Sequence, residues 1–167
     1  MQFLAVLVLA TLAAWSLPAR FGGRSLRDAM RRGLGVGFLV TGASHLAMPA
    51  SFLVYFPDWV PAPEAIVYAS GLVEVVGGLA LFVRRYRRQV GLAMAAYLVL
   101  VFPANVYAAV AGVDENLPGL VDAAWYPWAR LPFQALFVWW ALRSTQPAAS
   151  AARADGARGL TPAGAAR

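Results

Sequence analysis

Five long apolar segments restrict this chain to a helical fold in contact with lipid. They cover residues 3–19, 33–56, 64–83, 90–112 and 123–142. A bilayer core about 30 Å thick is crossed by roughly 20 apolar helical residues. Hydrophobic residues make up 60% of the chain and charged residues only 13%, which is far from the balance of a soluble domain. The sequence therefore predicts an all-α integral membrane protein whose first partner is the lipid bilayer.

The charges between the segments alternate along the chain. Five arginines lie in residues 20–32, four in residues 84–88 and four from Arg143 onward, whereas residues 57–63 and 113–122 contain no basic residue. Basic loops stay in the cytoplasm under the positive-inside rule. We therefore expect the amino terminus outside and the carboxyl terminus in the cytoplasm. The basic residues serve topology and anionic lipid, and no nucleic-acid partner is expected.

Four regions follow from this pattern. Residues 1–19 are expected to form an additional transmembrane helix; a signal peptide is the alternative, although no basic residue precedes the apolar run. Residues 20–32 are a basic cytoplasmic loop, and residues 33–143 form a four-helix membrane domain. Residues 144–167 are small, polar and broken by proline and glycine, which is typical of a disordered tail.

A few strongly polar side chains interrupt the apolar segments, and they are the candidate site residues: His45, Glu74, Asn105, Arg130 and Gln134. A helix rises about 1.5 Å per residue, which puts the histidine, the glutamate and the arginine near one depth at mid-membrane. Ionisable groups at that depth are costly unless they face the interior of the bundle and find partners.

The spacing of small residues supports an interior position. Gly71, Glu74 and Gly78 share one helical face, and Gly35, Phe38, Gly42 and His45 share another. Small residues let membrane helices approach closely. Pro49 is expected to continue the His45 face as a proline inside the helix.

The simplest resolution of the buried charges is an ion pair between Glu74 and Arg130. His45, Asn105 and Gln134 would then be hydrogen-bond partners, because an unpaired charge in hydrocarbon costs several kcal/mol. Pro103 and Pro132 interrupt two of the helices and suggest a small wet cavity that opens outward. A purely structural role for each polar residue remains an open alternative.

The sequence lacks the residues that several kinds of catalytic and cofactor site require. The chain has no cysteine and one histidine, so no metal site, thiol chemistry or nucleotide fingerprint is visible. We do not expect the chain to be an enzyme by itself, and no catalytic residue can be assigned. The glycine-rich runs at 33–37 and 71–78 are interpreted as helix-packing sites.

At these residues the sequence resembles the DoxX family of small bacterial membrane proteins. The resemblance rests on "GLGVGFLVTGASHLAMPASF", "YASGLVEVVGGLALF", "FPANVYAAV" and "WARLPFQALFVWWAL", which follow in order through residues 31–142. It implies a four-helix membrane bundle with the histidine, glutamate, asparagine and arginine named above in its interior. The first segment is then an addition to that core.

The resemblance also implies a place in the bacterial inner (plasma) membrane and a link to membrane redox systems. The first hypothesis is an accessory or quinone-associated subunit, with a quinone head group in the polar layer. The second is a non-catalytic scaffold or assembly factor whose polar layer is a structural lock. Subunits of a membrane redox complex, or copies of the same chain, would be its partners. A small-molecule carrier has less support, because no clear inverted repeat is present.

Overall fold

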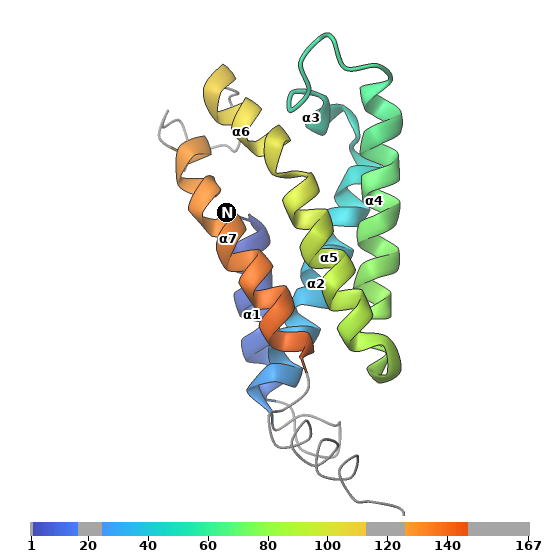
Figure 1. The fold of residues 1–167 in the computed structure, drawn as a ribbon, viewed down its shortest axis with the longest axis vertical. Helices are drawn as coiled ribbons and strands as arrows, with labels where there is room; N and C mark the ends of the chain where they lie inside the picture. The colour runs from blue at the N-terminus through green and yellow to red at the C-terminus, as the bar shows by residue number, and fades with distance from the viewer. Residues whose placement is uncertain (1, 17–24, 113–125, 147–167) are drawn as a thin grey trace, which may run out of the picture.

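The computed structural model describes residues 2–16, 25–112 and 126–146. Every regular element in these ranges is helical, so the all-α prediction is confirmed. The elements, shown in Figure 1, are α1 (Gln2–Ser16), α2 (Leu26–Ala47), α3 (Ala50–Leu53), α4 (Pro63–Ala80), η2 (Arg84–Tyr86), α5 (Arg87–Leu100), α6 (Phe102–Ala111) and α7 (Tyr126–Thr145). The acidic stretch 113–122, the C-terminal tail from 147 and the end of the first segment lie outside the described residues.

Two stretches among the described residues are long and apolar enough to cross a membrane. They are α4, at Pro63–Ala80, and the nearly continuous run Arg84–Ala111, which includes α5 and α6. The apolar part of α1, Phe3–Ser16, is shorter. The first turns of α2 carry Arg27, Asp28, Arg31 and Arg32 from the expected basic loop. Four spans plus one additional span, and the orientation of the chain, therefore stay predictions.

The long helices run alternately up and down, so their ends meet in pairs. The guanidinium of Arg31, near the start of α2, donates to the carbonyl oxygen of Leu81 at the end of α4. Trp140 of α7 donates to the carbonyl oxygen of Met30 over 3.0 Å. Gly91 at the start of α5 lies against Thr145 at the end of α7. One end of the bundle therefore holds the starts of α2 and α5 and the ends of α4 and α7.

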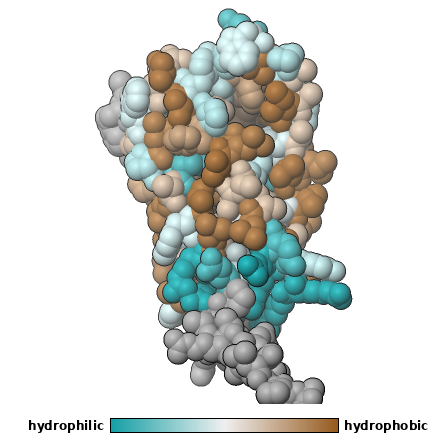
Figure 2. Space-filling view, in the orientation of Figure 1, coloured by the Kyte–Doolittle hydropathy of each residue, from teal (hydrophilic) through white to brown (hydrophobic). Residues whose placement is uncertain are grey.

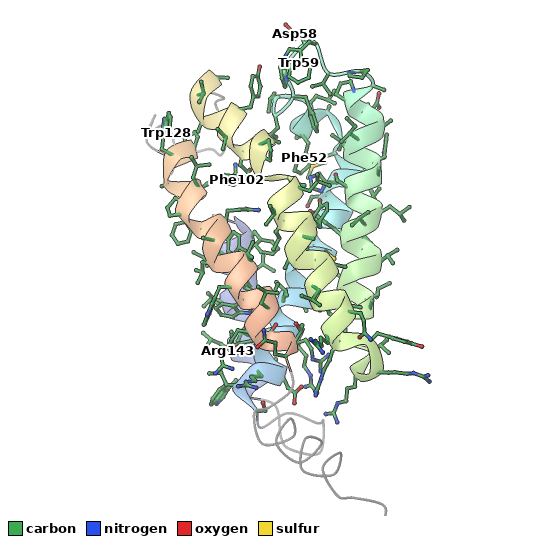
Figure 3. The ribbon with its side chains drawn as sticks, in the orientation of Figure 1. Phe52, Asp58, Trp59, Phe102, Trp128 and Arg143 are labelled. Atoms are coloured by element: carbon green, nitrogen blue, oxygen red, sulfur yellow. The ribbon has the colours of Figure 1, made fainter. Side chains whose placement is uncertain are left out.

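Most of the charged residues in the described ranges lie at that end. Figure 2 shows a hydrophilic band there and apolar side chains over the middle of the same face. Figure 3 places Arg143 at this end and the exposed Asp58 and Trp59 at the opposite one. The described arginines other than Arg130 belong to helix starts or ends at the hydrophilic end; they are Arg27, Arg31, Arg32, Arg84, Arg85, Arg87, Arg88 and Arg143.

The two predicted glycine stripes face each other between α2 and α4. A Cβ atom placed on Gly42 would lie 2.8 Å from the carbonyl oxygen of Gly71, and one on Gly78 would lie 2.9 Å from that of Gly35. Both distances are shorter than real Cβ contacts, so the backbones meet where no side chain fits. The predicted interior face of α2 and α4 is confirmed. This close contact of α2 and α4 sets the positions of His45 and Glu74 along the bundle axis relative to each other.

The second apolar segment is not one helix, and the prediction of a continuous helix over 33–56 with Pro49 inside it was wrong. The helix begins earlier, at Leu26, so the predicted loop 20–32 supplies its first turns. It ends at Ala47, and Met48 has φ −135° and ψ 56°. The ring of a proline disfavours helical geometry at the residue before it. Pro49 therefore ends α2 instead of lying inside it, and the short helix α3 follows.

The fourth segment is interrupted as expected. Val101 separates α5 from α6, and Pro103 lies in the first turn of α6, where a missing N–H group costs least. Pro132 lies inside α7. After the interruption, α6 packs against α7, beside its upper part (Figure 1).

Candidate functional site: a polar cavity in the bundle

Glu74 of α4 is the centre of a first polar group, which we call the acidic cluster and which consists of His45, Glu74 and Tyr97. The glutamate is 7% exposed. Its Oε1 accepts a hydrogen bond from the Tyr97 hydroxyl at 2.8 Å, and its Oε2 lies 3.2 Å from Nδ1 of His45. Both carboxylate oxygens thus have a partner from another helix, which is the condition for burying such a group.

Local sequence explains how the three side chains meet. Gly71, one turn before Glu74, lets the backbone of α4 approach His45, because a Cβ at that position would lie 2.8 Å from the Cβ of His45. The ring of Phe52, from α3, lies against the imidazole with centroids 3.9 Å apart. The break between α2 and α3 at Met48 and Pro49 is what lets Phe52 reach the His45 ring. The proline therefore shapes the site from outside the helix.

Arg130 of α7 is the centre of a second group, the basic cluster, which consists of Tyr55, Asn105 and Arg130. The guanidinium donates to the Tyr55 hydroxyl at 2.9 Å and to Oδ1 of Asn105 at 3.3 Å. It also lies over the ring of Tyr55, with Cζ 5.4 Å from the centroid, in cation–π geometry. Three separate elements, the turn after α3, α6 and α7, supply these side chains.

The direct ion pair between Glu74 and Arg130 was a wrong prediction. Among the described residues, the partners of Glu74 are His45 and Tyr97, and the partners of Arg130 include Tyr55 and Asn105. Each of the two groups instead has a tyrosine hydroxyl as a hydrogen-bond partner. The predicted contacts of His45 with the glutamate and of Asn105 with the arginine are present.

Both clusters face one cavity of about 820 Å³, and it brings all five predicted site residues together. Its walls are mostly apolar and aromatic, with contributions from α1, α2, α4, α5, α6 and α7 and from the segment between α2 and α4. Small-molecule sites are concave, mainly apolar and of about 300–1,000 Å³, with a few placed polar groups. The arrangement fits an amphipathic molecule that carries hydrogen-bonding oxygen atoms.

Gln134 forms a hydrogen bond between helices, although its partner is neither Glu74 nor Arg130. Its amide donates to the carbonyl oxygen of Leu98, in the last turn of α5, and the side chain is 8% exposed. This bond connects α7 to α5 immediately before the interruption at Val101. Gln134 thus holds the cavity wall and also lines the cavity.

Sequence reasoning missed three residues of the site: Phe52, Tyr55 and Tyr97. Each is aromatic in an apolar segment, where an interfacial or lipid-facing position is the usual interpretation. The available signal was the hydroxyl of the two tyrosines, since a buried Tyr O–H group needs an acceptor. In the described part of the chain no three His, Cys, Asp or Glu side chains gather as a metal site would require.

Comparison with known proteins identifies the family of this chain, and the function of that family is unknown. The model of a domain of unknown function, DUF8561, matches residues 34–145. The chain belongs to this family. The match runs from α2 to the end of α7, so it contains both polar clusters and leaves α1 outside. No curated protein and no solved structure matches the chain.

The Tyr97 hydroxyl provides a direct test of the acidic cluster. Tyr97→Phe leaves Oε1 of Glu74 without its donor in a buried place, and we expect a loss of about 1–2 kcal/mol of stability. Tyr68→Phe, on an exposed part of α4, is the matched control and should change nothing. Thermal unfolding in detergent measures both. Equal melting temperatures for the two variants would show that the Tyr97–Glu74 bond contributes no stability.

Proposed function

We propose that the chain is a multi-pass protein of the bacterial inner membrane whose interior cavity binds a small amphipathic molecule with a quinone-like head group. In this proposal α2, α4, α5–α6 and α7 form a DoxX-like four-helix membrane bundle, and α1 is the additional span. The amino terminus lies outside and the carboxyl terminus in the cytoplasm. The protein acts as an accessory or quinone-associated subunit of a membrane redox system.

The apolar surface supports the membrane part of the proposal. Large hydrophobic side chains are more than half exposed along the outer faces of the helices, among them Leu72, Val76 and Leu79 of α4 and Val99 of α5. Extended exposed apolar faces mark contact with another apolar phase. The hydrophilic band with most of the arginines bounds this surface at one end (Figure 2). That distribution is the one expected for a helical bundle in a bilayer.

The observation that carries the binding proposal is the shared cavity of the two clusters. Arg130 and Tyr55 would donate hydrogen bonds to a carbonyl oxygen of the head group. Glu74 and His45 would face a hydroxyl group of the head as hydrogen-bond and proton acceptors, because a carboxylate oxygen and an imidazole nitrogen are the usual side-chain acceptors. The aromatic walls would hold a flat ring. A quinone, when bound, supplies the electron chemistry that the side chains lack.

A second candidate function also has an observation in its favour. The carboxylate of Glu74 and the guanidinium of Arg130 already have hydrogen-bond partners inside the bundle. Satisfied polar networks of this kind fix one helix arrangement. A non-catalytic scaffold or assembly factor, in contact with a partner complex or with a second copy of the chain, would use the clusters as a structural lock.

Mass spectrometry of small molecules that co-purify from the native membrane in mild detergent distinguishes the two functions. We expect a quinone-like molecule with the wild type and its loss with Arg130→Ala. Arg143→Ala, at an exposed residue at the far end of the bundle, is the matched control and should keep the molecule. Melting temperatures confirm that each variant is folded. If no small molecule co-purifies with any folded variant, the binding proposal is contradicted and the structural lock is favoured.

A further inference from the structure

The part of the cavity between α4 and α5 has a lower edge that contacts between these two helices define. Gly77 of α4 lies directly against the side chain of Met94 of α5, so the two helices are in contact there. One turn further from the hydrophilic end, the Tyr97–Glu74 hydrogen bond joins them again. The cavity begins at that bond: on these two helices its lining residues run from Ile66 to Glu74 and from Tyr97 onward.

Beyond that point the walls are two stripes at helical spacing. On α4 the stripe is Ile66, Ala69, Ser70 and Val73, and on α5 and α6 it is Tyr97, Leu100, Val101 and Ala104. Residues that line a closed interior would be buried. Instead Ile66 is 42% exposed, Val73 44% and Leu100 76%.

The interruption at Val101 explains why the α4 stripe and the α5–α6 stripe move apart. The chain from Phe102 onward follows a separate helix, α6, which packs against α7 and leads away from α4 (Figure 1). The gap is about 12 Å long from Glu74 to Ile66, at a rise of 1.5 Å per residue. This side of the molecule carries the apolar surface described above (Figure 2).

Polarity differs between the rim and the depth of this opening. The exposed rim residues, such as Ile66, Val73 and Leu100, are apolar, whereas Glu74 is buried and His45 and Arg130 are largely enclosed. A molecule that enters here passes its polar head across an apolar rim and leaves its apolar body at the rim. A hydrated solute would lose its water at the rim without compensation.

We propose that the gap between α4 and α5–α6 is a lateral portal to the bilayer, through which the cavity takes a lipid-soluble ligand with a single hydrogen-bonding head. The ligand's head lies at the acidic and basic clusters, and its apolar body lies between the two stripes. This inference rests on the proposed binding function and adds the access route and the solubility class of the ligand. The segment with Trp59 and Val60 also borders the cavity, and access from water at that end is the competing route.

The experiment fills the portal and leaves the clusters intact. Ala69→Trp adds a large side chain at the exposed rim, and Leu72→Trp, which is 58% exposed and does not border the cavity, is the matched control. The probe is a benzoquinone with one isoprenoid unit, titrated against the full chain in phospholipid nanodiscs by native mass spectrometry. We expect at least tenfold weaker binding with Ala69→Trp and no change with Leu72→Trp. Val73→Trp, one turn further, repeats the test if Ala69→Trp lowers the melting temperature.

A second readout does not depend on the probe. The chain has no cysteine, so Ala69→Cys accepts one nitroxide label. Oxygen dissolves in lipid, and a nickel chelate dissolves in water. We expect collisions with oxygen to increase the spin relaxation rate of the label far more than collisions with the chelate. A label reached mainly by the chelate overturns the portal. Unchanged probe binding in Ala69→Trp and Val73→Trp, with loss in Val60→Trp, also overturns it and assigns the aqueous route. No binding by the wild type overturns the proposed function itself.

Discussion

Gly42→Ala should be one of the most damaging small changes in this protein. The new Cβ would lie 2.8 Å from the carbonyl oxygen of Gly71 and 2.9 Å from the backbone nitrogen of Val75. Backbone atoms in the middle of a packed helix cannot move aside locally, so α2 and α4 must separate along their length. Overpacking of this kind costs about 1–3 kcal/mol. The expected result is a clearly lower melting temperature in detergent.

Gly77→Ala is the matched control for this prediction. Its new Cβ also meets a neighbour, but the neighbour is the flexible side chain of Met94, which can adopt another rotamer. We expect a much smaller loss of stability than for Gly42→Ala. If the two variants melt together, the close approach of α2 and α4 does not determine the stability of the bundle.

Arg31→Ala is the second change with a large expected effect. The arginine is 2% exposed, and its guanidinium donates to the carbonyl oxygen of Leu81 and to Oδ1 of Asp28, the latter at 3.2 Å. Removal leaves the end of α4 without this donor and empties the volume of a large buried side chain. Each effect costs on the order of 1–3 kcal/mol. We expect a total loss of about 2–6 kcal/mol, measured by thermal unfolding.

Arg85→Ala provides the comparison at the same end of the bundle. Arg85 is exposed and lies over the ring of Tyr86, 5.5 Å from its centroid. An exposed cation of this kind contributes little, about 0.5–1 kcal/mol. A loss with Arg85→Ala as large as with Arg31→Ala would mean that net charge, and not the buried contact with Leu81, stabilises this end.

The interior faces could be predicted from the sequence because helical spacing determines them. Glycines at i and i+7 on each of two segments mark two helix faces that can pack closely against each other. The depth of His45 and Glu74 then follows from the rise of a helix. These residues accordingly meet as expected. The same spacing places Arg130 and Gln134 on one face of α7, and both border the cavity.

The partners within the site could not be predicted in the same way. Glu74 and Arg130 were predicted to pair because they lie at a similar depth in the membrane. Depth does not show which other side chains, here those of two tyrosines, face each charged group. Tyr97 and Tyr55 take those contacts, and each looked like an ordinary aromatic residue of an apolar segment. The position of Tyr55 depends on the helix break at Met48, which the continuous apolar run of residues 33–56 does not reveal.

The two glycine faces of α2 also have a consequence for the order of assembly. Gly35 and Gly42 approach α4, while Gly33 and Gly37 approach α1, at Thr11 and Phe3. A ribosome completes α1 and α2 before any later helix, and chains begin to fold from the amino-terminal side during synthesis. A helical hairpin of α1 and α2 can therefore form first, with the face for α4 still open, and the remaining helices then add to it in the order in which they emerge.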